Sequence, residues 1–160
     1  MASKTMRIAF LMADYGHDPT ETAIPYAAFA MAGFAIDFVT EKGSSPICDR
    51  KMLEGWTQKL LGAEAATVTA YNAMIKSQSW QSASSWSDIA FDLKAYDLVF
   101  LPGGHDQGVR QILDSRRAQS LLTEYFPLTK KPSGMVCAAI CHGVQALAHS
   151  KGADDVWCWF

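Results

Sequence analysis

The chain has 160 residues, of which 49% are hydrophobic and 19% are charged, and its formal net charge at pH 7 is -2. This length and composition predict one globular domain over residues 1–160, with a sizeable core. The nearly balanced charge gives no electrostatic basis for binding nucleic acid or an anionic membrane, so we expect neither as a partner.

The start of the chain and its cysteines point to a reduced intracellular protein. The first apolar run, Ile8–Ala13, is too short to span a membrane, and no clear cleavage site follows it. The four cysteines lie at positions 48, 137, 141 and 158, without a CxxC pair or the spacing of a zinc site. We therefore expect free thiols, a cytoplasmic location and no metal site.

The first forty residues predict a strand, a helix and a second strand. Met6–Met12 is mostly apolar, which is typical of a buried strand, and Ala13–His17 is predicted as the loop after it. A helix-forming stretch comes next, and Phe34–Thr40 alternates enough to form the second strand. This order and spacing predict a right-handed βαβ unit.

The predicted helix has clear signals at both ends. Asp18 is suited to the N-cap, Pro19 to the first helical position and Glu21 to the closing position of a capping box. Pro25 is expected to kink the helix or to confine it to the first turn, and Gly33 is expected to end it. The predicted apolar face comprises Ile24, Ala27, Ala28, Met31 and Ala32.

The middle of the chain carries weaker signals. Leu53–Lys76 is mostly compatible with a helix. Ser77–Ser87 is rich in serine, which is typical of a loop, but Trp80 and Trp86 argue against a disordered linker. One interpretation is that this segment packs over the sheet edge or over a site. We prefer the alternative that both tryptophans pack on the surface and have no role in substrate binding.

A second group of elements follows. Tyr96–Leu101 is the clearest strand after the first, and Pro102–Asp106 ends it with the pair Gly103–Gly104. Two glycines directly after a buried parallel strand allow a tight turn that presents backbone N–H groups at the sheet edge where ligands bind. A plain turn is the alternative. Arg116–Phe126 is predicted to be a helix.

The most informative stretch lies near the end of the chain. Gly134–Ile140 is small or apolar throughout, which predicts a central strand buried on both faces of a parallel sheet. Cys141, His142 and Gly143 follow, and then a helix-compatible stretch, Val144–His149. A thiol at the change from strand to helix, with a small residue two positions to either side, fits a nucleophile elbow. An inert buried thiol is the alternative.

The expected surroundings of Cys141 favour nucleophilic chemistry. The unpaired N–H groups and the dipole of the following helix are expected to lower the pKa of the Cys141 thiol. The backbone N–H groups of Gly104 and His142 are expected to form an oxyanion hole beside it, and the His142 imidazole can pair with the thiolate or move a proton. Three side chains at the same predicted sheet end are expected to line the pocket: Tyr15, His17 and His105.

Together these motifs resemble those of the DJ-1/PfpI superfamily. Within the first matching segment, Glu21–Pro25 and Ala32–Thr40 look most like the Hsp31-like branch, which is known for glutathione-independent glyoxalase (glyoxalase III) and chaperone members. The resemblance extends over about residues 7–149. The segments that carry it are Pro19–Gly43, Pro102–His105 and Ala138–Gly143.

The resemblance implies a three-layer, flavodoxin-like α/β sandwich with a mostly parallel central sheet, and a homodimer. It implies that Cys141 is the nucleophile, Glu21 the acid/base, His142 the catalytic histidine and Gly104 a backbone donor. The implied lyase reaction converts methylglyoxal or another small 2-oxoaldehyde into lactate through a hemithioacetal on Cys141, without metal or organic cofactor. Glu21 therefore has two interpretations, capping and catalysis, and we favour catalysis.

One departure from the family keeps alternatives open. Members of this branch continue for several tens of residues, so the C-terminal part of the family fold, with an acidic partner for His142, is expected to be missing. Asp154 and Asp155 come too soon to match that acid. The alternatives are an inactive truncated member, a stress protein acting as holdase chaperone or thiol redox sensor, and another cysteine-dependent enzyme such as an isocyanide hydratase.

Overall fold

The computed structural model describes residues 5–53 and 63–151 and confirms the predicted α/β class. Asp154 and Asp155, and part of the predicted Leu53–Lys76 helix, lie outside the described residues. The strands are β1 (Arg7–Leu11), β2 (Tyr15–His17), β3 (Ala35–Thr40), β4 (Ile47–Cys48), β5 (Ser84–Ser85), β6 (Leu98–Leu101) and β7 (Val136–Ala139). The α-helices are α1 (Pro19–Met31), α3 (Ala65–Met74), α4 (Gln78–Gln81), α5 (Arg110–Asp114), α6 (Arg116–Tyr125) and α7 (Gly143–His149). Short 3-10 helices are η1 (Arg50–Met52), η2 (Leu93–Ala95), η3 (Gln107–Val109) and η4 (Phe126–Thr129).

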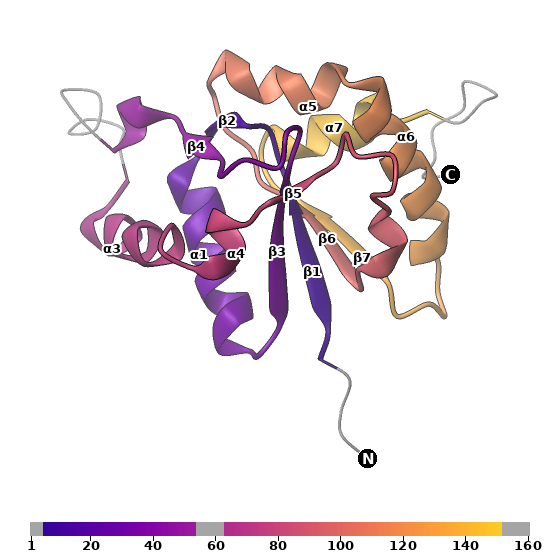
Figure 1. Ribbon diagram of the computed structural model, residues 1–160, viewed down its shortest axis with the longest axis horizontal. Coiled ribbons are helices and arrows are strands. Elements are labelled where there is room, and N and C mark those ends of the chain that lie inside the picture. Colours follow the sequence, from indigo (N-terminus) through magenta and orange to yellow (C-terminus); the bar gives the residue numbers. More distant parts are fainter. Residues whose placement is uncertain (1–4, 54–62, 152–160) are drawn as a thin grey trace.

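The main sheet is parallel throughout and has the strand order β5-β3-β1-β6-β7 (Figure 1). β1 lies at the centre, where Phe10 is opposite Phe38 of β3 and Phe100 of β6. The Phe10 ring contacts both, with centroid distances of 5.3 and 4.8 Å. Because the strands are parallel, the segments after β1, β6 and β7 leave from the same edge of the sheet, with β6 between the other two.

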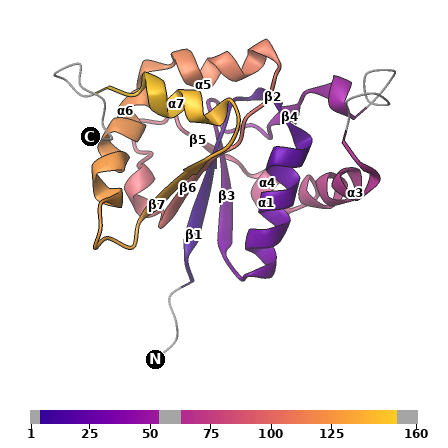
Figure 2. The same ribbon diagram turned by 180° about the vertical axis from the view of Figure 1, so that it is seen from behind.

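Helices cover both faces of the sheet, which confirms the predicted three layers (Figure 2). One face packs against α1, α3 and α4, with Met74 and Trp80 among its buried contacts. The other face packs against α5, α6 and α7, with Leu122 and Ala146 among its contacts. A parallel sheet needs this double cover because its strands are apolar on both faces.

β7 lies at an edge of the sheet, so the prediction of a central strand buried on both faces is wrong. Cys137 of β7 is opposite Val99 of β6, and within the described residues no strand pairs with the other side of β7. Val136 is 42% exposed. The apolar run correctly indicates a strand, but apolar composition does not distinguish a central strand from an edge strand.

The predicted loop Ala13–His17 contains a short strand, β2. β2 pairs in parallel with β4, with Tyr15 opposite Ile47, and forms a second, two-stranded sheet. The prediction of a loop is therefore wrong over Tyr15–His17. The pairing depends on a distant segment, and the residues of β2 do not indicate it by themselves.

Both tryptophans of the serine-rich segment are core residues, so the preferred prediction of surface packing is wrong. Trp80 and Trp86 are 4% and 0% exposed. The Trp86 indole N–H donates a hydrogen bond to the Met12 carbonyl at 3.3 Å. β5 pairs with β3, so this segment extends the edge of the main sheet. Burial of the large indole rings outweighs the polarity of the serines around them.

α1 runs past Pro25 to Met31, although Pro25 was expected to kink it or to confine it to one turn. The predicted apolar face is also wrong, because Ile24 and Met31 are 46% and 89% exposed. α1 instead packs on the sheet through Ala23 and the Phe29 ring. The Phe29 ring contacts the Phe10 and Phe100 rings and has more apolar area to bury than the alanines of the predicted face.

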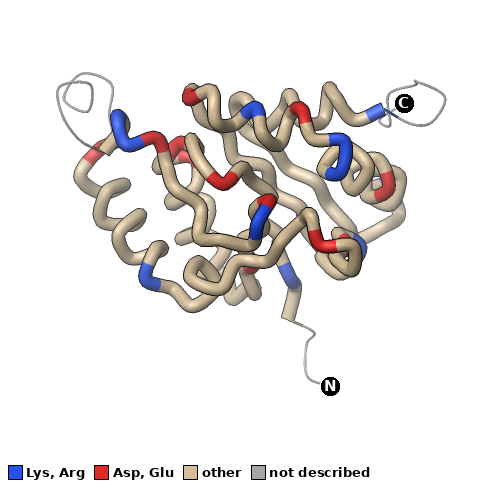
Figure 3. Tube along the Cα trace, turned by 45° about the horizontal axis from the view of Figure 1, so that its top comes forward, with Lys and Arg blue, Asp and Glu red and all other residues tan. Residues whose placement is uncertain are grey.

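Charged residues are interspersed over the molecule. Lys and Arg, in blue, and Asp and Glu, in red, are spread over the trace in Figure 3 and do not gather on one helix or strand. No helix in the described part of the chain has the length and apolarity that a bilayer crossing requires.

Candidate active site

The turn after β7 places Cys141 in the left-handed region of backbone conformation, with φ at 51°. Among the non-glycine residues that the structure describes, Cys141 alone has a positive φ. The Ile140 N–H donates to the Leu101 carbonyl at 3.1 Å, and the Val144 N–H donates to the Cys141 carbonyl at 3.2 Å. α7 begins two residues later at Gly143, so the strand-to-helix turn has the form of an elbow. The thiol is exposed, so the alternative of a buried, inert cysteine is wrong.

The start of α1 directs the Glu21 carboxyl toward this turn. Asp18 is the N-cap as predicted, because its carboxylate accepts from the Thr20 and Glu21 N–H groups at 2.7 and 3.0 Å. The Asp18 N–H, however, donates to the Gly103 carbonyl at 2.9 Å, so Glu21 does not complete a capping box. Glu21 Oε2 instead accepts from the Gly103 N–H at 3.1 Å, and the carboxyl lies close enough to the Cys141 thiol for each group to influence the pKa of the other.

Gly103 is the point where these segments meet. A Cβ atom there would lie 2.8 Å from Cys141 Cβ, from Glu21 Oε2 and from the His142 nitrogen. Gly103 follows β6, which stands between β1 and β7, so sheet order brings the three segments together. The Gly103–Gly104 pair is therefore more than a plain turn, because it leaves the space in which Glu21 and Cys141 come into contact.

Replacing Gly103 with alanine is expected to push these groups apart. We expect the free energy of unfolding to fall by about 1–3 kcal/mol and the alkylation rate of Cys141 to change severalfold, because backbone or side chains must shift. Gly134→Ala is the matched control, since a Cβ there has no atom within 4 Å. Urea denaturation and mass-spectrometric alkylation rates measure both effects. Equal behaviour of the two variants would contradict this account of Gly103.

The His142 imidazole contacts the sulfur, and two backbone N–H groups influence its pKa. His142 Nδ1 lies 3.4 Å from Cys141 Sγ. The N–H groups of Gly104 and His142 each act to lower the pKa of the Cys141 thiol. The His105 ring packs edge-on against the His142 ring, with centroids 5.1 Å apart and an interplanar angle of 82°. The structure thus brings together five of the predicted site residues: Glu21, Gly104, His105, Cys141 and His142.

The pKa of the Cys141 thiol is raised, which corrects the prediction that it falls. Partial burial raises this pKa first, and the Glu21 carboxyl raises it further, against the two N–H groups. Burial also raises the pKa of Glu21, while its interactions with Cys141 and with the Gly103 N–H act in the other direction. Transfer of the Cys141 proton to Glu21 would leave a thiolate at Cys141.

A polar pocket of about 200 Å³ opens beside the two histidines. His105 and His142 lie in its wall, as do residues that the sequence did not indicate, such as Asp106, Arg110 and Gln145. Their positions in the sequence could have indicated them. Asp106 and Arg110 come after the Gly103–Gly104 turn, and Gln145 lies on α7, the helix after the elbow. The full lining is Gly104, His105, Asp106, Gln107, Val109, Arg110, Leu113, His142 and Gln145.

Two predicted lining residues lie elsewhere. His17 is 2% exposed and packs against the Trp80 ring, with its Nε2 3.5 Å from the Tyr71 hydroxyl, so the prediction that it lines the pocket is wrong. Tyr15 packs against Gly108: a Cβ atom at Gly108 would lie 2.7 Å from the Tyr15 carbonyl oxygen and 2.8 Å from its ring. Tyr15 is not part of the pocket wall. Pairing of β2 with β4 accompanies the burial of His17, whereas Tyr15 at the start of β2 is 37% exposed.

Buried His17 predicts a loss of stability in acid. Burial lowers its pKa from 6.5 to about 3, so its stabilising effect is complete above pH 6.5 and is lost as the pH falls toward 3. We expect the free energy of unfolding of the wild type to fall with decreasing pH more steeply than that of His17→Gln. The difference between the two slopes is expected to be about 1.4 kcal/mol per pH unit in that window. Urea titrations between pH 7.5 and pH 4.5 measure this difference. His149→Ala, which removes an exposed histidine, serves as control and should retain the full slope. Equal slopes for wild type and His17→Gln would contradict the assignment.

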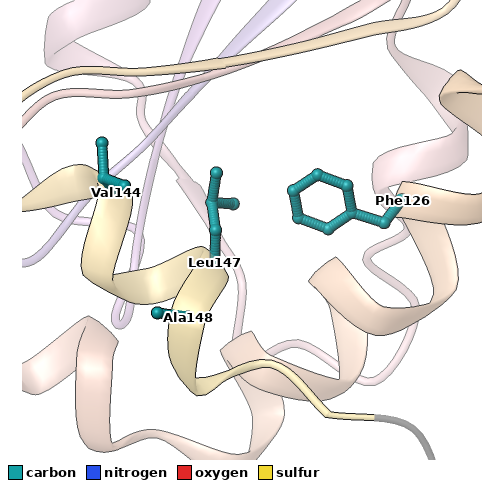
Figure 4. Close-up of a pocket in the computed structure, with 4 residues that line it drawn as sticks. All are labelled: Phe126, Val144, Leu147 and Ala148. Atoms are coloured by element: carbon teal, nitrogen blue, oxygen red, sulfur yellow. The ribbon is translucent and has the colours of Figure 1, made fainter. Parts of the chain in front are cut away.

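A second cavity is entirely apolar. Phe126, Val144, Leu147 and Ala148 line a space of about 140 Å³, and Figure 4 shows Leu147 and Phe126 directed toward each other across it. None of its side chains can donate, accept or attack, so the candidate active site is the polar pocket beside Cys141.

The expected acidic partner of His142 is not identified. Within residues 5–53 and 63–151, no carboxylate forms a hydrogen bond with His142. The His142 ring contacts the Cys141 sulfur and the His105 ring.

Fold and site together define an α/β protein with a cysteine elbow opposed by a glutamate. The chain belongs to the ThiJ/PfpI family, because the pattern described as ThiJ/PfpI family-like matches residues 12–157. This confirms the predicted DJ-1/PfpI superfamily.

Two curated relatives come from Schizosaccharomyces pombe. The chain is 32% identical over 154 residues to uncharacterized protein C14C4.04, covering 96% of this chain and 57% of the relative. It is 31% identical over 140 residues to glutathione-independent glyoxalase hsp3102, covering 86% of this chain and 52% of the relative. The chain therefore spans about half the length of these relatives.

Solved structures support the fold. Glyoxalase III from Candida albicans superposes with a TM-score of 0.62 at 16% identity, over 93% of this chain and 62% of that chain. Drosophila melanogaster DJ-1beta gives a TM-score of 0.59 at 20% identity, over 91% of this chain and 60% of that chain. At these identities the likeness shows the shared fold alone.

Proposed function

We propose that this protein is a cofactor-free glyoxalase of the Hsp31-like branch that converts methylglyoxal or a related 2-oxoaldehyde into a 2-hydroxy acid. One observation carries the proposal: Glu21 Oε2, which accepts from the Gly103 N–H at 3.1 Å, and Cys141 Cβ face the same point, each 2.8 Å from where a Cβ atom at Gly103 would lie. A proton carrier beside a nucleophile is what isomerisation of an adduct requires, and this closeness supports the proposal.

The proposed mechanism follows from that contact. Glu21 takes the Cys141 proton, the thiolate attacks the aldehyde carbon, and Glu21 gives that proton to the resulting alkoxide, which completes the hemithioacetal. Glu21, again a carboxylate, then removes the hydrogen of the former aldehyde carbon as a proton and delivers it to the neighbouring carbon through an enediol, which yields a thioester. Water cleaves the thioester, releases lactate and restores the thiol, so methylglyoxal plus water gives lactic acid. The Gly104 and His142 N–H groups would stabilise the oxyanions.

The relatives support this choice of substrate class. The 31% identical relative carries the name glutathione-independent glyoxalase, although this chain spans only 52% of it. The pocket beside Cys141 is small and polar, which suits a short, hydrated carbonyl compound better than an apolar ligand.

The direct test is lactate formation. The purified chain is incubated with methylglyoxal in the absence of glutathione and added metal, and lactate is measured by chiral chromatography. Lactate formation above the uncatalysed background is the expected result. A folded protein that forms none would contradict the proposal, and hydration of an isocyanide by the same protein would favour the isocyanide hydratase alternative.

A thiol redox sensor is the second candidate, favoured by the exposure of Cys141. Cys48 is buried and Cys137 is half-buried, and burial raises the pKa of Cys137 to about 12, whereas Cys141 is exposed. Hydrogen peroxide is therefore expected to oxidise Cys141 to sulfenic and then sulfinic acid before either of the other two. Peptide mass spectrometry after graded peroxide treatment measures the order, and oxidation of Cys137 first would contradict it.

A further inference from the structure

Three potential metal ligands converge at the mouth of the candidate site. Ligand atoms of His105, Cys141 and His142 all lie within 4.8 Å of one another. The set consists of two imidazoles and one thiol, and this combination of nitrogen and sulfur ligands suits zinc. No ligand spacing in the sequence indicates the cluster, because His105 follows β6 whereas the other two residues follow β7.

The three ligand atoms already lie close to a chelating arrangement. His142 Nδ1 already lies 3.4 Å from Cys141 Sγ. Zinc–ligand bonds of roughly 2.0–2.3 Å place neighbouring ligands of a tetrahedral ion roughly 3.3–3.8 Å apart, so this pair needs no rearrangement. The His105 ring stands edge-on to the His142 ring at 5.1 Å, and rotation of an exposed side chain can bring its nitrogen closer.

We propose that His105, Cys141 and His142 bind one zinc ion. The Cys141 thiol releases its proton to solvent as the sulfur–zinc bond forms, and the two histidines bind through neutral ring nitrogens. Three protein ligands leave the fourth tetrahedral position to water or to another small ligand. The polar pocket, which His105 and His142 line, gives that position access to solvent.

Zinc binding occupies the sulfur that the proposed reaction uses. If the proposed function holds, zinc therefore inhibits lactate formation reversibly, and a chelator restores it. This consequence depends on the proposed function, whereas the binding site itself does not.

Metal binding is tested directly on the full chain, without reference to turnover. Zinc chloride is titrated against reduced protein by calorimetry and by competition with a chromophoric chelator. We expect one ion per chain in the wild type and an affinity at least about tenfold lower in His105→Ala and in Cys141→Ser. His149→Ala is the matched control, because this histidine is exposed on the last turn of α7, and it should bind as the wild type does.

Cobalt provides an independent readout of the thiolate ligand. The cobalt-loaded wild type should show a sulfur-to-metal charge-transfer band in the near ultraviolet, and Cys141→Ser should lack it. Circular dichroism confirms that each variant is folded, and His105→Gln repeats the test with a larger side chain. The proposal is overturned if His105→Ala and His105→Gln both bind zinc as tightly as the wild type, or if His149→Ala loses as much affinity as they do. Failure of the lactate assay with intact zinc binding would contradict the proposed function alone.

Discussion

Cys141→Ala is expected to reduce lactate formation from methylglyoxal by about a thousandfold or more, because no other described thiol reaches Glu21. Alanine removes the sulfur that forms the hemithioacetal and leaves the Glu21 carboxyl without an adduct to isomerise. Initial rates of lactate release at saturating methylglyoxal measure the loss.

A second cysteine provides the control for this variant. Cys137 lies on β7 four positions earlier and is half-buried, and burial raises its pKa to about 12, so Cys137→Ala should retain the wild-type rate. If both variants lose activity equally, the loss reflects the sheet edge and not the nucleophile. If Cys141→Ala keeps its rate, the covalent mechanism is wrong.

Glu21→Gln is expected to lower the same rate by about a hundredfold to ten-thousandfold, which is the range for loss of a general acid/base. The amide keeps the shape of the side chain, and its oxygen can still accept from the Gly103 N–H. It has no exchangeable acid proton to carry between the two carbon atoms. Lactate release measures the loss, and urea denaturation should show a stable fold.

Two further measurements separate proton transfer from other losses in Glu21→Gln. Iodoacetamide should still alkylate Cys141, which would show that the thiol remains accessible. Glu124→Gln removes an exposed glutamate paired with Lys94 at 2.8 Å and should retain wild-type activity, since surface ion pairs contribute little. Wild-type activity in Glu21→Gln would exclude Glu21 as the proton carrier.

Much of the fold could be predicted because its signals are local or topological. An apolar run followed by a thiol and a glycine predicts the elbow at Cys141, and a cap at Asp18 with a proline after it predicts the start of α1. Parallel strands then place the ends of β1, β6 and β7 at one sheet edge, which is how Glu21, Gly103 and Cys141 come together. These steps require no knowledge of side-chain packing.

The errors arise where distant packing decides the outcome. His17 looks like a pocket residue by its position after β1, but the pairing of β2 with β4 buries it against Trp80. The same limitation applies to Trp86 in a serine-rich segment and to the exposed Met31 of α1. The raised pKa of Cys141 depends first on partial burial and then on the nearness of Glu21, which is distant in the sequence, and a helix-dipole argument includes neither.

The left-handed backbone at Cys141 implies a trade-off between durability and reactivity. A residue with a β-carbon pays roughly 1–2 kcal/mol to adopt φ near 51°, whereas glycine adopts it without that penalty. Selection for thermal robustness alone would thus favour glycine at this position, and the resulting protein would fold more securely yet have no sulfur to present. The cysteine at this position therefore lowers the free energy of unfolding somewhat and in exchange exposes a reactive thiol.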